Sequence, residues 1–200
     1  MSLMAFALVI GMLGTGAFAY FSDTETSSGN TFTAGTLDLK VYDPDADEFV
    51  DDDELGNIND YWNELVNNLK PGDSDTIIIP VKNAGTIPGT ADIHIKDVVN
   101  YENGQNDAEA AVDLSTGDLD GELGGVIQVQ ILYGDGVNPP VLVASGTLND
   151  LNCKNFNALV PLAADGTAVW IINMSIDGPG VGNEIQSDSV VCDVEFSLNQ

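Results

Sequence analysis

An acidic stretch at residues 43–54 has the composition of a calcium-binding loop. Against a twelve-residue calcium loop, its acidic side chains fill the first, third, fifth, ninth and twelfth positions: Asp43, Asp45, Asp47, Asp51 and Glu54. Glu48 stands where the sharp turn of such a loop requires glycine. Carboxylates this close repel one another unless a cation neutralises them. The stretch is therefore either a solvated acidic loop or a weak calcium site. We expect that the chain requires no cofactor, and calcium is the one candidate ion.

The sequence contains two cysteines, Cys153 and Cys192. In a secreted protein they are expected to form one disulfide, which would stabilise the fold by ~2–4 kcal/mol. The alternative is two buried thiols that pack as small hydrophobic side chains. The single histidine, His94, and two distant cysteines match no spacing of zinc ligands.

Asn173, Met174 and Ser175 form an N-glycosylation sequon, which makes Asn173 a candidate glycan acceptor. Strand alternation places Asn173 on the same face as Val169 and Ile171. That face could be exposed or covered, so both outcomes are compatible with the sequence.

No catalytic motif is found along the chain. The sequence has no His-Glu-x-x-His pair for zinc, no Gly-x-Ser-x-Gly elbow and no phosphate-binding loop. One histidine cannot form a two-histidine zinc site. We therefore predict that the protein is not an enzyme.

The charge balance excludes one class of partner. Thirty-two acidic residues face five basic ones, all lysines, and the net charge is −27 over 200 residues. Such a surface repels phosphate backbones, which argues against nucleic-acid binding. The hydrophobic fraction of 44% is ordinary and allows a sizeable core.

The amino terminus carries an export signal. Residues 3–21 contain no charge, and Ala17-Phe18-Ala19 is a small-x-small site, so cleavage is expected between Ala19 and Tyr20. No basic residue precedes the apolar run, as a signal peptide would normally require. A retained membrane helix and a pilin-type assembly helix are the alternatives, and only a retained segment would contact a membrane.

Seven segments of alternating or continuous apolar residues predict strands at 31–41, 76–83, 91–96, 126–133, 141–144, 167–176 and 190–198. Pro80 within the second predicts an edge or a bulge. Helical spacing predicts a helix at 60–69 and short turns of helix at 106–113 and 148–156. The fold expected is all-β, an antiparallel jelly-roll-like β-sandwich with one or two short helices in its connections, preceded by an N-terminal apolar helix.

Three groups of residues carry a family resemblance. Tyr20-Phe21-Ser22-Asp23 and the segment from Thr31 to Leu39 resemble the start of the TasA/camelysin family, which includes bacterial biofilm matrix fibres and archaeal bundling pili. Leu69-Lys70-Pro71-Gly72-Asp73, followed by Lys82-Asn83-Ala84-Gly85-Thr86, is similar to the family's turn and second strand. Gly182-Asn183 with Gln186, and a last strand ending in Phe196 and Gln200, resemble its carboxyl end.

The resemblance implies a secreted subunit of a cell-surface filament that polymerises with copies of itself, head to tail, by donor-strand exchange. The expected donor strand includes Tyr20, Phe21, Phe32, Thr33, Ala34, Gly35 and Thr36. The implied organisation is a signal peptide at 1–19, a donor segment at 20–36 and a jelly-roll domain at 37–200. Pairing of the same segment within its own domain is the alternative.

Three hypotheses about function follow. The first is a fibre or pilus subunit of the biofilm matrix type. The second is a monomeric calcium-binding module of the cell surface that takes part in adhesion. The third is a secreted metallopeptidase, an activity attributed to some camelysin-type relatives that no motif here supports.

Overall fold

The computed structural model describes residues 34–51, 70–115, 117–178 and 180–200. The chain divides into two units, 1–34 and 35–200, and the second is the one described below. The predicted cleavage site and the predicted helix at 60–69 lie outside the described residues. Within the described residues, no helix has the length and apolar character needed to cross a membrane.

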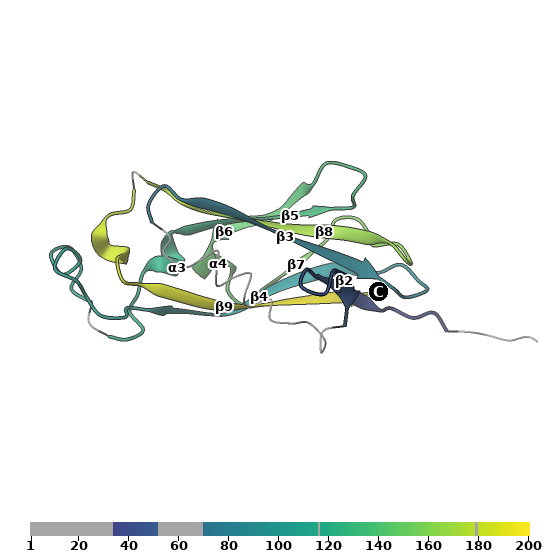
Figure 1. Cartoon of the computed structure of the whole chain (residues 1–200), viewed down its shortest axis with the longest axis horizontal. Coiled ribbons are helices and arrows are strands. Elements are labelled where there is room, and N and C mark those ends of the chain that lie inside the picture. Colours follow the sequence, from purple (N-terminus) through teal and green to yellow (C-terminus); the bar gives the residue numbers. More distant parts are fainter. Residues whose placement is uncertain (1–33, 52–69, 116, 179) are drawn as a thin grey trace, which may run out of the picture. The chain divides into compact units, whose positions relative to one another are not determined.

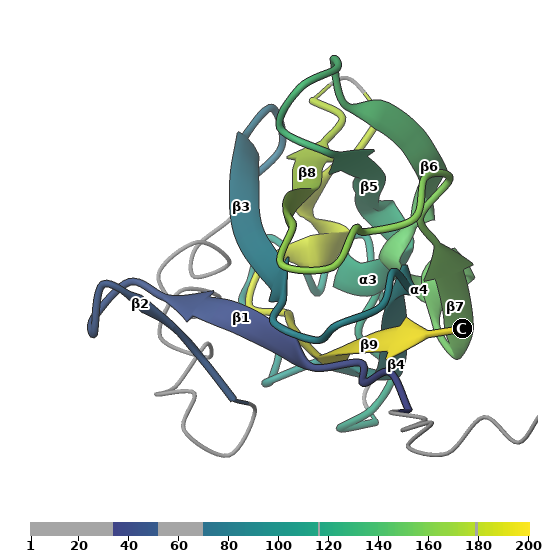
Figure 2. The ribbon, with the colours of Figure 1, turned by 90° about the vertical axis from the view of Figure 1, so that its right-hand side faces the viewer.

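The larger sheet has six antiparallel strands in the spatial order β2-β1-β3-β8-β5-β6 (Figure 2). Their bounds are β1 Leu39–Asp43, β2 Glu48–Val50, β3 Ser74–Asn83, β5 Ile127–Gly134, β6 Val141–Thr147 and β8 Thr167–Ile176. Strand β8 is central and pairs with β3 and β5 along its whole length.

The smaller sheet has three antiparallel strands in the order β7-β4-β9 and faces the larger one (Figures 1 and 2). Its strands are β4 Thr90–Tyr101, β7 Lys154–Asn157 and β9 Ser189–Asn199. From β3 onwards, every connection between described strands except the β5–β6 hairpin passes from one sheet to the other. Such crossings are typical of jelly rolls, and the predicted all-β antiparallel fold is confirmed.

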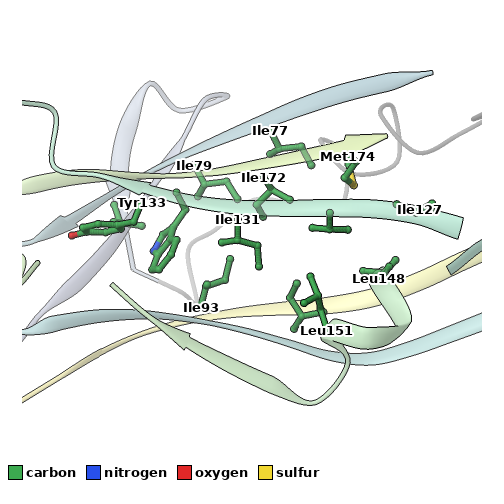
Figure 3. Packing of buried hydrophobic residues seen from close by; sticks show 14 of the residues in the cluster. Ile77, Ile79, Ile93, Ile127, Ile131, Tyr133, Leu148, Leu151, Ile172 and Met174 are labelled. Carbon is green, nitrogen blue, oxygen red and sulfur yellow. The ribbon is translucent and has the colours of Figure 1, made fainter. Parts of the chain in front are cut away.

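The core lies between the two sheets and is built by strand alternation. In β8 every second side chain is buried, and the side chains of Trp170, Ile131 in β5 and Ile93 in β4 are each completely buried. The rings of Trp170 and Tyr133 meet edge to face with centroids 4.9 Å apart. Figure 3 shows side chains of the larger sheet pointing toward Ile93 and Leu151. Full burial of each large side chain contributes ~1.5–3 kcal/mol.

Short helical elements join the sheets: α3 Leu123–Val126, α4 Leu148–Leu151 and the 3₁₀ turn η1 Asn183–Ile185. Helix α4 confirms the first half of the turn predicted at 148–156, and Thr147 and Asp150 cap it reciprocally. The second half is instead strand β7, because Cys153 adopts a positive φ of 58° that ends the helix. The turn predicted at 106–113 is present, with the Ala110 amide donating to the Asn106 carbonyl at 2.9 Å.

Candidate assembly surface and family membership

The last strand, β9, presents a half-covered apolar face. It pairs with β4 along one edge, and no other described strand pairs with the opposite edge. Its inward residues pack against the core but remain partly exposed: Val190, Cys192, Val194, Phe196 and Leu198. An edge of this kind has free backbone hydrogen-bonding groups and is a template for an added strand.

Part of strand β3 also has one edge without a partner among the described strands, on the same side of the sandwich. Strand β1 pairs only with residues 81–83 of β3, so residues 74–80 pair with β8 alone among the described strands. Pro80, predicted at an edge or a bulge, lies where the pairing with β1 stops and has no N–H to donate. Because β7 lies next to β6 at the other side, β3 and β9 both border this side of the sandwich (Figure 2).

The segment that leads into β1 is fixed to a loop of its own domain. The Thr86 amide donates to the Thr36 carbonyl at 2.8 Å, and the Thr36 amide donates to Thr86 Oγ1 at 3.0 Å. The Ala84 amide donates to the Asp38 carbonyl at 2.7 Å. Thr36 is therefore held by hydrogen bonds within its own domain.

Asn83 gives this loop its shape. Its fully buried side-chain amide donates to the Ile87 carbonyl at 2.8 Å and accepts from the Gly85 amide at 3.0 Å. A Cβ at Gly85 would lie 2.2 Å from the Thr36 carbonyl oxygen, and one at Gly35 would lie 2.2 Å from Ile87 Cγ2. Glycine is thus required at both positions for the close approach.

These contacts correct the boundary of the predicted donor strand. Gly35 and Thr36 belong to the contacts of their own domain, whereas Ala34 is exposed at the start of the described region. Tyr20, Phe21, Phe32 and Thr33 lie outside the described residues. The donor strand itself stays a prediction.

A family model described as camelysin metallo-endopeptidase matches residues 1–197. The chain belongs to this family. Because the family includes TasA, the predicted TasA/camelysin resemblance is confirmed. Membership supports an extracellular or cell-surface protein of the biofilm matrix. No curated protein matches the chain.

The described part of the acidic stretch in this camelysin-family chain, residues 43–51, belongs to a hairpin. Strands β1 and β2 pair Asp43 with Glu48, and the Asp43 carboxylate accepts from the amides of Asp45 at 2.9 Å and Ala46 at 3.3 Å. The Asp47 carboxylate accepts from the Tyr42 hydroxyl.

Of the two remaining predicted calcium ligands, the structure describes only Asp51. Asp51 forms an ion pair with Lys40 at 2.9 Å, and Glu54 lies outside the described residues. Neither group of metal-ligating oxygens found in the described region includes Asp43, Asp45, Asp47 or Asp51. Asp43, Asp47 and Asp51 thus have separate partners, and calcium binding by the acidic stretch stays a prediction.

The predicted disulfide is not formed, and Cys153 and Cys192 are free thiols. Cys153 directly precedes β7 and Cys192 lies on β9, on opposite sides of β4. Two strand spacings separate their backbones by about 9–10 Å, whereas a disulfide requires Cα atoms within about 7 Å. Burial, reinforced by the neighbouring Asp193 carboxylate, raises the pKa of Cys192 to about 11.

Asn173 and His94 both lie on outer faces of the sandwich, as their strand alternation predicts. Asn173 is half-buried in central strand β8, and its side-chain oxygen accepts from the Thr76 hydroxyl at 2.9 Å. Its glycosylation stays a prediction. His94 is half-buried on β4, with Nδ1 3.7 Å from a Glu195 carboxylate oxygen.

Five carboxylates that the sequence did not single out meet near one end of the sheets: Glu102, Glu109, Asp113, Glu122 and Asp188. Four of them lie in the connection between β4 and α3, and Asp188 lies just before β9, so no single spacing template could identify the group. They are unusual because two of them, Glu102 and Glu109, are buried.

The family is described as camelysin metallo-endopeptidase, and only this description connects the chain with proteolysis. The cluster offers only carboxylate oxygens as ligands, whereas catalytic zinc sites normally include histidine or cysteine. The prediction that the chain is not an enzyme is left untested by this membership.

Proposed function

We propose that this protein is the structural subunit of an extracellular fibre in which residues 20–34 of one copy add a strand to the sandwich of the next. The observation that carries the proposal is the half-covered apolar face of β9 beside its unpaired edge. An incoming strand would complete the backbone hydrogen bonds and cover the partly exposed side chains at the same time.

The dimensions agree with this role. Strand β9 has 11 residues and extends over about 36 Å at ~3.3 Å per residue. Residues 20–34, if extended, would span about 50 Å. The donor segment could therefore cover the whole of β9 and leave a few residues to bridge between two subunits.

The contacts of Thr36 make the arrangement directional. Because Thr36 is bound to the loop at 83–87, the donor segment starts from a fixed point on its own subunit. Each subunit would give one strand and receive another through different surfaces. Such a head-to-tail contact does not close on itself and propagates as a filament.

The experiment compares the full chain with a variant lacking residues 20–34, using electron microscopy and circular dichroism. We expect the full chain to form fibres and the deletion variant to remain a folded β-sheet monomer. Adding a synthetic peptide of residues 20–34 should raise the melting temperature of the variant, whereas a scrambled peptide should not. Fibres formed by the deletion variant would contradict the proposal.

The alternative, pairing of residues 20–34 with their own domain, gives a different result in the same experiment. The full chain would then be monomeric at all concentrations, and the added peptide would not change its melting temperature. The metallo-endopeptidase activity named for the family has its own test. Proteolysis of casein by the purified chain, abolished by a chelator, would favour that activity.

A further inference from the structure

The five carboxylates form two overlapping groups. Ligand oxygens of Glu102, Asp113 and Glu122 lie within 4.8 Å of one another, and so do those of Glu102, Glu109 and Asp188. Glu102 directly follows β4, Glu122 precedes α3 and Asp188 precedes β9. The groups thus connect three segments near one end of the sheets.

The two central carboxylates are buried and incompletely bonded. Glu109 is 0% exposed and Glu102 is 2% exposed, yet Oε1 of each has no hydrogen-bond partner. Oε2 of Glu122 and Oδ1 of Asp188 are likewise buried without a partner. A buried carboxylate oxygen without a partner is strongly unfavourable, so its presence in two neighbouring side chains points to a missing positive ligand.

The second oxygen of each carboxylate is held in place. The Asn106 amide donates to Glu109 Oε2 at 3.3 Å. The Ser115 hydroxyl lies 2.5 Å from Asp113 Oδ2 and 3.2 Å from Glu102 Oε2, so these two carboxylates share its single hydrogen. The Glu122 amide donates to Asp188 Oδ2 at 2.6 Å. One oxygen oriented by the protein and the other left open is the arrangement expected of metal ligands with supporting hydrogen bonds.

No basic side chain neutralises these groups. The sequence has no arginine, and all five lysines lie in the described residues. Four of them form ion pairs with acids outside the cluster: Lys40–Asp51, Lys70–Asp73, Lys82–Asp165 and Lys96–Glu195. The fifth, Lys154, forms no ion pair with the cluster. Burial and the neighbouring carboxylates raise the pKa of Glu102 and, to about 7, that of Glu122.

We propose that these five residues bind calcium: Glu102, Glu109, Asp113, Glu122 and Asp188. Only oxygen ligands are offered, which favours a hard divalent cation. Calcium takes six to eight oxygens in a flexible shell and accepts bidentate carboxylates, whereas magnesium requires a stricter octahedron and retains more water. Glu102 belongs to both groups, so it would bridge two ions or bring both groups to one ion. The ion would tie the loop after β4 to the segment that leads into β9.

The test is a calcium titration of the full chain by calorimetry, at protein concentrations where electron microscopy shows monomers and no fibres, with melting temperatures recorded in parallel. We expect saturable binding of one or two ions and a higher melting temperature in calcium than in sodium chloride of equal ionic strength. Magnesium should bind at least about tenfold more weakly. No heat and no shift, an equal shift in sodium chloride, or equal affinity for magnesium would overturn the proposal.

Two variants locate the site. Glu109→Gln and Glu102→Gln should each lower calcium affinity at least about tenfold, while their melting temperatures without calcium stay equal or rise because a repulsive charge is removed. The control, Asp45→Asn with Asp47→Asn in the hairpin, should bind calcium as the unmodified chain does. Loss of binding in the control alone would overturn the assignment. The measurement uses monomers, so its outcome is independent of whether fibres form.

Discussion

Strands β8 and β9 have the same alternating pattern but very different burial. All five inward side chains of β8, from Ala168 to Ile176, are at most 4% exposed. The five inward side chains of β9 are only partly buried. Strand β8 lies between two long neighbours, whereas β9 pairs with β4 alone among the described strands. The position of a strand in its sheet, more than its sequence pattern, therefore decides how well its apolar face is covered.

The largest expected effect is on fibre assembly, and it tests whether the partly exposed inward face of β9 is the assembly surface. Val194→Asp places a charge on the half-covered face, so we expect fibres to disappear while the monomer loses about 1–3 kcal/mol of stability. The measurements are electron microscopy and urea unfolding. Val191→Asp is the matched control, since Val191 lies on the opposite face of the same strand and is 51% exposed. Its fibres should persist, and their loss would show that the inward face is not the relevant surface.

Truncation of one aromatic side chain in each strand measures how much the burial of β8 and of β9 contributes to the free energy of unfolding. Trp170→Ala in β8 removes a completely buried side chain and should lower the free energy of unfolding by about 3–5 kcal/mol. Phe196→Ala in β9 should cost the monomer only about 1–2 kcal/mol, because Phe196 is partly exposed. Chemical denaturation of the two variants gives both values. Equal losses would mean that β9 is as well covered in solution as β8.

The two thiols provide a smaller, local test. Cys153 is exposed, whereas burial raises the pKa of Cys192, so Cys192 should react with a maleimide at least about tenfold more slowly. If a donor strand covers β9, fibres should protect Cys192 further and leave the rate at Cys153 unchanged. Mass spectrometry after timed labelling measures both rates. A single unreactive pair released only by reductant would instead indicate a disulfide.

The smallest effect is expected on the outer face of the smaller sheet, where Lys96 of β4 faces Glu195 of β9. Lys96 lies 3.0 Å from the Glu195 carboxylate, which lowers the pKa of that carboxyl, but both side chains are substantially exposed. Lys96→Met should therefore change stability by less than about 1 kcal/mol, and added salt should remove the difference. Thermal melts at low and high salt provide the measurement. A larger effect would imply that this outer face is also covered.

Much of the fold could be predicted because inward and outward residues alternate strictly. The pattern located β1, β3, β4, β5, β6, β8 and β9, and it placed His94 and Cys192 on the correct faces. Two short strands escaped prediction. Strand β2 has three residues inside an acidic stretch, and β7 has four residues directly after a helical turn. Elements this short carry too few residues to show a period.

The sites were harder to predict because they depend on distances between strands and loops. Alternation tells which face Cys192 occupies but not that β4 separates it from Cys153. The density of acids at 43–54 suggested calcium ligands, yet Asp43 bonds to its own turn and Asp51 to Lys40. The buried carboxylates Glu102 and Asp188 come together only when the chain has crossed between the sheets several times.

The attachment of Thr36 to the loop at 83–87 also has a mechanical consequence. Gly89 packs against both Leu37 and the end of β9, so the segment that enters the domain passes beside the strand proposed to receive a donor. Strand β1 runs antiparallel to β3, and a pull directed along β1 would act along the shared direction of the two strands. The hydrogen bonds between them would then be sheared together and not opened one at a time. A fibre built this way would carry tension from the donor segment to the sandwich along its strands.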